Sequence, residues 1–346
     1  MTPTEQSLPR DELSVVRTAI DRASLRDVLT AATRAPSVYN CQPWRWRADP
    51  GSGIDLFADP DRRLPATDPD GRDQLLSCGA ALHHLVAAMA GAGWSAEVTR
   101  LPDPENIHHL AHIDPQGARP APELARLAEA IPHRRTDRRR FGPEPVETAL
   151  LDTLAEQAAP YQAHAHVVTG TARERLIAII SESAGLQQRQ PGYPAEAARW
   201  GSRFANAGDG IPAGTAAARG AGRHGDVPMR ASVNALLAQP PHGLDHDDAS
   251  TLIVLSTDGD DRFARLRAGE ATSAILLTAT IHGLATTPLS QPLEIVETRN
   301  SITAHFAGHG RSAQLLLRLG RPQTGAPPLP PAPRRALRFV LELTGT

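Results

Sequence analysis

The 346-residue chain contains no lysine, so all 36 of its basic residues are arginine. Arginine presents a planar fork of donors that stays charged at any working pH and suits phosphate, although a GC-rich genome also favours arginine over lysine. The only cysteines are Cys41 and Cys78, too few for a disulfide framework or a four-cysteine metal site. We therefore expect two ordinary thiols in a reducing compartment.

Long apolar runs are missing as well. No run approaches the roughly 18 residues that a membrane-spanning helix needs. The polar segment 1–13 does not resemble a signal peptide, so we expect a cytoplasmic protein without a membrane partner. The net charge of −2 provides no overall positive field for nucleic acid, which means that any anion site must be local. With 40% apolar and 21% charged residues, the chain is typical of a globular protein.

Apolar periodicity predicts two similar sets of elements, one in each half of the chain. Alternating residues around an Asp-Pro-Gly-Ser-Gly turn predict a hairpin over 44–59. Thr171 and Glu174 form a capping box that predicts the start of a helix. The other predicted elements are one or two helices over 11–34, helices over 75–94 and 264–283, and strands near 95–100, 109–113, 251–257 and 313–319.

The two halves resemble each other along the sequence. Gly79 and Gly269 each open a helix rich in small residues, and each is followed fourteen positions later by Gly93 or Gly283. We expect two half-units, at 1–122 and 123–346. The segment 191–248 is rich in Gly, Pro, Ala and Arg, and a loop of this length inside a compact domain is usually a lid or a binding loop. We expect a lid-like insertion in the second half.

The segment APSVYNCQPWRW at 35–46 is the first candidate binding motif. Short polar side chains on a turn between a helix and a strand can converge on a planar ligand that forms hydrogen bonds. The alternative from these residues alone is a capped turn with a buried tryptophan. The candidate residues are Pro36, Ser37, Asn40, Gln42 and Trp44.

The segment HRRTDRRRFGPEPV at 133–146 is the second candidate motif. Forked arginine donors and a hydroxyl just before a helix can hold a phosphate, although such runs are more often solvated turns. The candidates are Arg134, Arg135, Thr136 and Arg138, with Arg139 as an alternative to Arg138.

Two later segments add further candidates. GLATTPLSQP at 283–292 contains Pro288, Leu289, Ser290 and Gln291, and it could also be a buried turn between a helix and a strand. PAPRRALRFVL at 332–341 contains Arg334 and Arg335, and it could also be an exposed basic tail.

Two weaker patterns predict no site. His108 and His112 have the spacing of metal ligands, but no glutamate accompanies them as in HExxH, so we predict no metal site there. The glycine pattern at 220–225 follows no predicted strand, which argues against dinucleotide binding of the Rossmann type.

Together these motifs resemble the nitroreductase superfamily, in particular its double-length, fused, Acg-like FMN-binding branch. The resemblance implies an α+β nitroreductase-like fold in which two half-units form an intramolecular pseudo-dimer. It also implies that the first motif lies against the flavin of FMN, the arginine motif and Arg334–Arg335 hold its phosphate, and 288–291 pass its ring. Because each motif occurs once, we expect one site per chain and a monomer.

The resemblance further implies a function. NAD(P)H acts as a transient reductant, and an electron-poor acceptor such as a nitroaromatic or a quinone receives two electrons. The hydride chemistry belongs to the cofactor, so we predict no catalytic acid or base. The alternative is a non-catalytic FMN storage or sequestration protein with a lid over the flavin.

Overall fold

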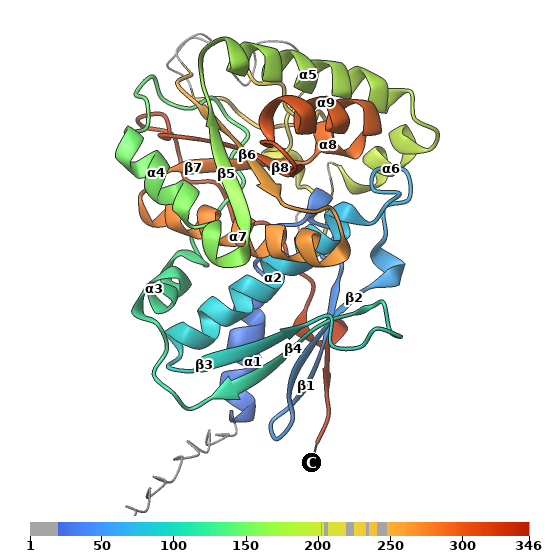
Figure 1. The fold of residues 1–346 in the computed structure, drawn as a ribbon, viewed down its shortest axis with the longest axis vertical. Coiled ribbons are helices and arrows are strands. Elements are labelled where there is room, and N and C mark those ends of the chain that lie inside the picture. Colours follow the sequence, from blue (N-terminus) through green and yellow to red (C-terminus); the bar gives the residue numbers. More distant parts are fainter. Residues whose placement is uncertain are drawn as a thin grey trace, which may run out of the picture.

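Two β-sheets with helices between them form the computed structural model of the chain (Figure 1). The structure describes residues 20–201, 203, 207–218, 225–232, 235–240 and 248–345. In Figure 1 the long helices α2 and α7 lie between the sheets, and α5, α8 and α9 cover the outer face of the second sheet. None of the helices within the described residues is long and apolar enough to cross a membrane.

The first sheet has the strand order β3-β4-β2-β1-β9. Its hairpin β1–β2 is antiparallel, as the alternation around the glycine turn predicts, while β9 from the C-terminus pairs with β1 in parallel. The elements of this half are α1 (Arg22–Ala32), β1 (Trp44–Asp49), β2 (Gly53–Ala58), α2 (Arg72–Gly91), β3 (Ser95–Arg100), β4 (His109–Gln116), α3 (Pro122–Ala130) and β9 (Leu341–Leu343).

The second sheet has the strand order β5-β6-β8-β7, with every neighbouring pair antiparallel. The predicted strands over 251–257 and 313–319 and the predicted helix over 264–283 are confirmed within two residues. The elements are α4 (Thr148–Glu156), β5 (Ala163–Val168), α5 (Gly170–Gln188), α6 (Tyr193–Trp200), β6 (Thr251–Thr257), α7 (Arg262–Ile281), β7 (Ala285–Leu289), α8 (Gln291–Glu294), α9 (Val296–Phe306) and β8 (Ser312–Gly320).

The two halves share one topology. Each sheet can be read from the strand that follows its long helix, β3 after α2 and β7 after α7. The order β3-β4-β2-β1 in the first sheet then corresponds to β7-β8-β6-β5 in the second. Helices α2 and α7 both have 20 residues, and each position on α7 follows its counterpart on α2 by 190 residues. The internal similarity suggested by the glycine spacing is therefore visible in the order of the strands.

Helices α2 and α7 cross where both carry a glycine. A β-carbon at Gly79 would overlap the carbonyl oxygen of Leu266, and one at Gly269 would overlap the carbonyl oxygen of Leu76. Because Leu76 and Leu266 are also counterparts, the two contacts are symmetric. The absence of side chains at both glycines lets the helix backbones touch.

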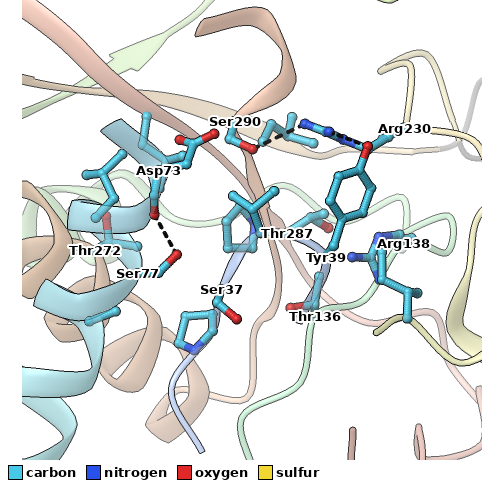
Figure 2. Close-up of a pocket in the computed structure, with 18 of the residues that line it drawn as sticks. Ser37, Tyr39, Asp73, Ser77, Thr136, Arg138, Arg230, Thr272, Thr287 and Ser290 are labelled. Carbon is cyan, nitrogen blue, oxygen red and sulfur yellow. Dashed lines mark hydrogen bonds between the residues drawn. The ribbon is translucent and has the colours of Figure 1, made fainter. Parts of the chain in front are cut away.

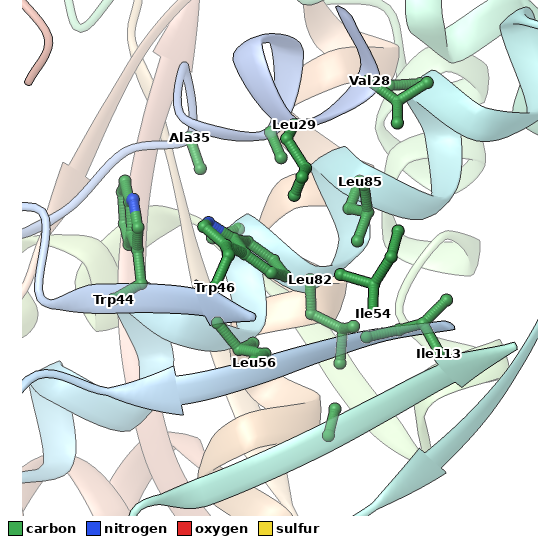
Figure 3. Packing of buried hydrophobic residues seen from close by; sticks show 14 of the residues in the cluster. Val28, Leu29, Ala35, Trp44, Trp46, Ile54, Leu56, Leu82, Leu85 and Ile113 are labelled. Carbon is green, nitrogen blue, oxygen red and sulfur yellow. The ribbon is translucent and has the colours of Figure 1, made fainter. Parts of the chain in front are cut away.

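Buried aromatic and aliphatic side chains attach α2 to the first sheet (Figure 3). Trp46 and Leu56 from the hairpin and Leu82 and Leu85 from α2 are at most 1% exposed. Full burial of side chains of this size stabilises the fold by roughly 1.5–3 kcal/mol each. The site described below is therefore built on a rigid support.

Among the other sequence predictions, one is wrong and two lie partly outside the described residues. The capping box at Thr171 is wrong, because α5 begins at Gly170 and Thr171 lies inside the helix; its N-cap is Thr169, which makes no side-chain capping bond. Of the predicted helical region 11–34, Arg22–Ala32 is helical and 11–19 lie outside the described residues. His109 and His112 both lie on β4, and both contact Asp55 on β2. Most of the glycine pattern at 220–225 also lies outside the described residues.

Candidate functional site

Two adjoining pockets lie where the halves meet. They share Pro36, Ser37, Thr136, Arg138 and Ile211 in their walls. Their empty space, including solvent at the mouths, is about 810 Å³ and about 690 Å³. We call the first the central pocket; its other residues are Val38, Tyr39, Asp73, Leu76, Ser77, Ala80, Met229, Arg230, Thr272, Thr287, Pro288, Leu289, Ser290 and Leu315.

We call the second the arginine pocket. The described residues in its wall include no acidic side chain. Its arginines are Arg34, Arg134, Arg135, Arg138 and Arg334. A wall with five guanidinium groups and no carboxylate among its described residues could hold an anion, in a chain whose net charge is −2.

Arg134 is the most deeply buried of these five arginines. It is 5% exposed, and the only hydrogen bond from its side chain to a described residue is a long one of 3.4 Å from Nη2 to the carbonyl oxygen of Arg34. Its Nε and Nη1 have no hydrogen-bond partner among the described residues. Buried guanidinium donors normally have partners, so these two donor atoms could bind a group that comes from outside the chain.

Burial and neighbouring cations lower the pKa values in the arginine pocket. Burial, then Arg135, lowers the pKa of Arg134 to about 10. Burial, then Arg230, lowers the pKa of Arg138 to about 10. Burial, then the other arginines, lowers the pKa of Arg334 to about 9. All three guanidinium groups stay charged at neutral pH, and an anion between them would relieve their repulsion.

Arg334 is held by the first half of the chain. Its Nε donates to the carbonyl oxygen of Thr33 at 2.7 Å, and its Nη2 donates to that of Arg34 at 2.8 Å. Its Nη1 donates to the side-chain oxygen of Asn40 at 2.9 Å. Because all of these acceptors are neutral, these bonds orient the guanidinium group without cancelling its charge.

The turn at 36–42 has an unusual backbone. Tyr39, Asn40 and Gln42 have φ values of 51°, 54° and 52°, in the left-handed region that non-glycine residues rarely occupy. The Oγ atom of Ser37 accepts a bond of 3.0 Å from the backbone N–H of Gln42, which holds the turn. Such strained turns concentrate at binding sites. Here the turn places residues 36–39 in the wall of the central pocket.

Eleven of the fifteen predicted site residues lie in these walls. They are Pro36, Ser37, Asn40, Arg134, Arg135, Thr136, Arg138, Pro288, Leu289, Ser290 and Arg334. Arg138 is in both walls, whereas Arg139 forms an ion pair with Asp137, with 2.7 Å between Nη2 and Oδ2. The carboxylate two residues earlier therefore turns Arg139 away and leaves Arg138 at the pocket.

Four predicted site residues lie outside both walls. Trp44 is fully buried in the hydrophobic core of the first half. Gln42 joins segments, since its Nε2 donates to the carbonyl oxygen of Gly208 and its Oε1 accepts from the backbone N–H of Arg335. Gln291 donates to Gln187, and Arg335 pairs with Asp59. These four side chains support the site through packing, hydrogen bonds and an ion pair outside the two walls.

The sequence did not reveal several residues of the central pocket (Figure 2). Arg230 donates to the hydroxyl of Tyr39 at 2.8 Å, stacks over its ring and forms an ion pair with Glu294. Asp73 and Ser77 enter from the first turns of α2. Tyr39 and Thr287 lie within predicted motifs and could have been found there, whereas Arg230 and Asp73 lie in no motif.

Parts of the predicted lid-like insertion contact the site. Ile211 is in both walls, and the carbonyl oxygen of Thr215 accepts a bond of 3.1 Å from Arg138. Asp209 pairs with Arg62 at 2.6 Å, which ties the insertion to the first half. The described part of the insertion therefore forms one side of the site.

The symmetric position in the other half is filled. By the offset of 190, Glu270 on α7 corresponds to Ala80, and Arg100 at the end of β3 corresponds to Ser290. Arg100 donates to Glu270 through Nε and Nη2, both at 2.7 Å, and Glu270 is 1% exposed. The side chain of Glu270, paired with Arg100, therefore occupies the position that corresponds to the methyl group of Ala80 in the central pocket.

Comparisons with known proteins identify the family of this chain. The model of the nitroreductase family matches residues 131–308. A Mycobacterium tuberculosis (strain ATCC 25618 / H37Rv) protein named "Putative NAD(P)H nitroreductase Rv3131" is 43% identical over 322 residues, or 93% of this chain and 92% of that one. A second protein of that strain, "Putative NAD(P)H nitroreductase acg", is 37% identical over 331 residues, or 92% and 95%.

Among solved structures, the FMN-dependent nitroreductase NfnB from Mycobacterium smegmatis in complex with NADPH is similar to part of the chain. The TM-score is 0.39 at 17% identity, over 64% of this chain and 100% of that one. The family match and the relatives that extend along most of the chain show that it belongs to the nitroreductase family, and its α+β nitroreductase fold is the one that the sequence predicts.

Proposed function

We propose that the chain binds one FMN across the two pockets and works as an NAD(P)H-dependent oxidoreductase. The observation that carries this proposal is the arginine pocket, in which Arg134 has two donor atoms without a partner among the described residues. The names of the relatives, NAD(P)H nitroreductases, point to the same chemistry.

The residues fit the two ends of this cofactor. A phosphate would accept charge-assisted bonds from Arg134, Arg135 and Arg334, which are the strongest hydrogen bonds that proteins form. The central pocket suits a flat ring, because apolar side chains such as Leu76 and Leu289 alternate with hydroxyl groups. When bound, FMN supplies the hydride chemistry, from NAD(P)H to an electron-poor acceptor such as a nitroaromatic or a quinone.

The chain's own residues would bind the cofactor, orient it and shield it from water. Thr136 and Arg138 lie in both walls and would set the depth at which the cofactor sits. Tyr39 and Arg230, held together by a hydrogen bond, close one side of the central pocket against water. Precise orientation and exclusion of water are the main contributions that a protein makes to cofactor chemistry.

The shared topology supports an intramolecular pseudo-dimer of two half-units, 1–122 and 123–346, with one complete site. The filled position at Arg100 and Glu270 accounts for the missing second site. We also propose a monomer in the cytoplasm, where two free, buried thiols are stable. One flavin per chain, measured by absorbance on a monomeric peak in size-exclusion chromatography with light scattering, is the expected result.

The Arg134→Ala/Arg135→Ala double variant tests the phosphate assignment. Loss of two charge-assisted bonds of about 1.5–3 kcal/mol each lowers the FMN affinity by roughly 10² to 10⁴-fold. The control is Arg321→Ala, which removes an arginine that pairs with Glu147 outside both pockets. Titration of the apoproteins with FMN gives the affinities. Unchanged affinity in the double variant would place the phosphate elsewhere.

The alternative, FMN storage without turnover, is supported by the contacts of the insertion with Arg138 and Arg62 over the site. Anaerobic addition of NADPH or NADH separates the two functions. Rapid bleaching of the flavin, with parallel double-reciprocal lines in steady-state kinetics, is expected of the oxidoreductase. A flavin that stays oxidised would favour storage.

A further inference from the structure

Asp73 is a buried acid in the wall of the central pocket. It lies in the first turn of α2 and is 5% exposed. Its Oδ2 atom has no hydrogen-bond partner among the described residues. The proposed function gives this carboxyl group no role, since neither a phosphate nor a flat ring requires a carboxylate.

Glu294, behind the pocket, is one of the carboxylates that face Asp73. Its carboxylate accepts from Arg230, from Gln187 and, at 2.7 Å, from the hydroxyl of Ser290. Arg230, Gln187 and Ser290 therefore supply donors to the oxygen atoms of Glu294. The carboxyl group of Asp73 faces this carboxylate, which is one of the neighbours that raise its pKa. Buried carboxyl groups near each other favour a proton on one of them, and the raised pKa assigns that proton to Asp73.

The surroundings of Asp73 keep that proton in place. The charged groups that face it are Asp68 in the preceding loop, Glu294 on α8 and Arg230 in the insertion. The Oδ2 atom of Asp68 accepts from the backbone N–H of Gln74 at 2.9 Å. From α7 the pocket receives the uncharged Thr272. Burial, then the two neighbouring carboxylates, raises the pKa of Asp73 well above its ordinary value of 3.8, with Arg230 opposing.

We propose that Asp73 donates the proton that accompanies hydride transfer to the electron acceptor. This inference rests on the proposed function and assigns a catalytic acid to its site. A quinone becomes a hydroquinone by gaining one hydride, which NAD(P)H supplies, and one proton. The O–H bond of Asp73 breaks, a new O–H bond forms on the carbonyl oxygen of the quinone, and the electron pair of the broken bond stays on Asp73. Water then returns a proton to the carboxylate.

The position of Asp73 suits this step. Its carboxyl group borders the same cavity as Ser290 and Thr287, so a molecule in the pocket reaches all three. General acids of this kind contribute typically 10² to 10⁴-fold to a rate, and they work best when their pKa lies near the operating pH. Carboxyl groups reach this range when they are buried beside another carboxylate.

The test separates the two half-reactions of the holoprotein in stopped-flow measurements. Asp73→Asn is expected to bind FMN and to be reduced by NADPH like the wild type, while its reoxidation by a quinone slows by about 10² to 10⁴-fold. The wild-type reoxidation rate falls as the pH rises through the pKa of Asp73, and this dependence disappears in the variant. Asp258→Asn, which removes an exposed acid paired with Arg311, is the control and keeps the wild-type profile.

Two further measurements do not depend on turnover by Asp73→Asn. Glu294→Gln removes a neighbouring charge, so the fall of the reoxidation rate moves to lower pH. In the apoprotein, the folded state keeps Asp73 protonated while the unfolded chain ionises above about 3.8. Stability is thus lost as pH rises, and the stability gained by Asp73→Asn grows with pH above that value in urea unfolding.

The outcomes are distinct. A stability gain that does not change with pH, or a variant that reoxidises at the wild-type rate, overturns the role of Asp73. A wild-type protein that binds no flavin, or whose reduced form does not react with quinones, overturns the proposed function instead.

Discussion

The buried arginines of the site lower the stability of the apoprotein. Arg134 is buried next to Arg135 and Arg334, and the pKa of each is lowered chiefly by burial. A buried charge without an opposite charge destabilises a fold. By contrast, the equally buried Arg139 pairs with Asp137. This difference between neighbours in one short segment supports our proposal that Arg134 binds the ligand, while Arg139 serves the fold.

Replacement of Arg134 by methionine therefore has opposite effects on the two properties. We expect the Arg134→Met apoprotein to be more stable by about 1–3 kcal/mol, because an unpaired buried charge is replaced by an apolar side chain. FMN affinity is expected to fall by roughly 10 to 100-fold, for the loss of one charge-assisted bond. Urea unfolding of the apoprotein and fluorescence titration measure the two quantities. If stability and affinity both decrease, Arg134 is a structural residue.

The site depends on the crossing of helices α2 and α7. Both helices contribute to the central pocket, through Asp73, Ser77 and Ala80 from one and Thr272 from the other. Their separation at the crossing is set by the backbones themselves, because Gly79 meets the carbonyl oxygen of Leu266. A shift of either helix therefore changes the width of the pocket.

The Gly79→Ala substitution tests this dependence. The new methyl group would overlap a backbone oxygen, which cannot rotate away, so we expect a loss of about 1–3 kcal/mol in the free energy of unfolding and a lower flavin content. Gly185→Ala on α5 is the matched control, because nothing lies within 4 Å of its added carbon. That change should stabilise the helix by about 0.5–1 kcal/mol. Equal effects of both substitutions would refute the tight crossing.

At the scale of the whole molecule, the C-terminal segment connects the halves. After β8 the chain returns to the first half, where Arg334 bonds to the carbonyl oxygens of Thr33 and Arg34 and β9 pairs with β1. The site therefore combines the beginning, the middle and the end of the chain, and it can form only when both halves are folded.

Truncation separates the two roles of this segment. A chain that ends at residue 329 loses Arg334 and β9, and we expect it to be purified without flavin and with lower stability. A chain that ends at residue 340 loses β9 but keeps Arg334, so it should bind FMN with a lower melting temperature only. Flavin absorbance and calorimetry provide the measurements. Flavin retained by the shorter chain would show that Arg334 is dispensable.

The sequence by itself determined several of the elements and four of the five arginines in the arginine pocket. The alternation in the hairpin and the helical spacing in α2 and α7 are local, and Arg134 and Arg138 lie in a short segment next to a turn, so their neighbourhood could be predicted. The periodicity of apolar residues is a pattern within a short stretch of sequence. These elements could therefore be predicted without knowledge of the rest of the chain.

Only the tertiary structure decided which distant side chains meet. Trp44 packs in the core and Gln42 joins three segments, although both lie in a predicted binding motif. Asp73, Arg230 and Glu294 come from three separate segments that no spacing rule connects. Contacts of this kind form when whole helices and sheets pack, and their geometry depends on all the surfaces that are buried at once.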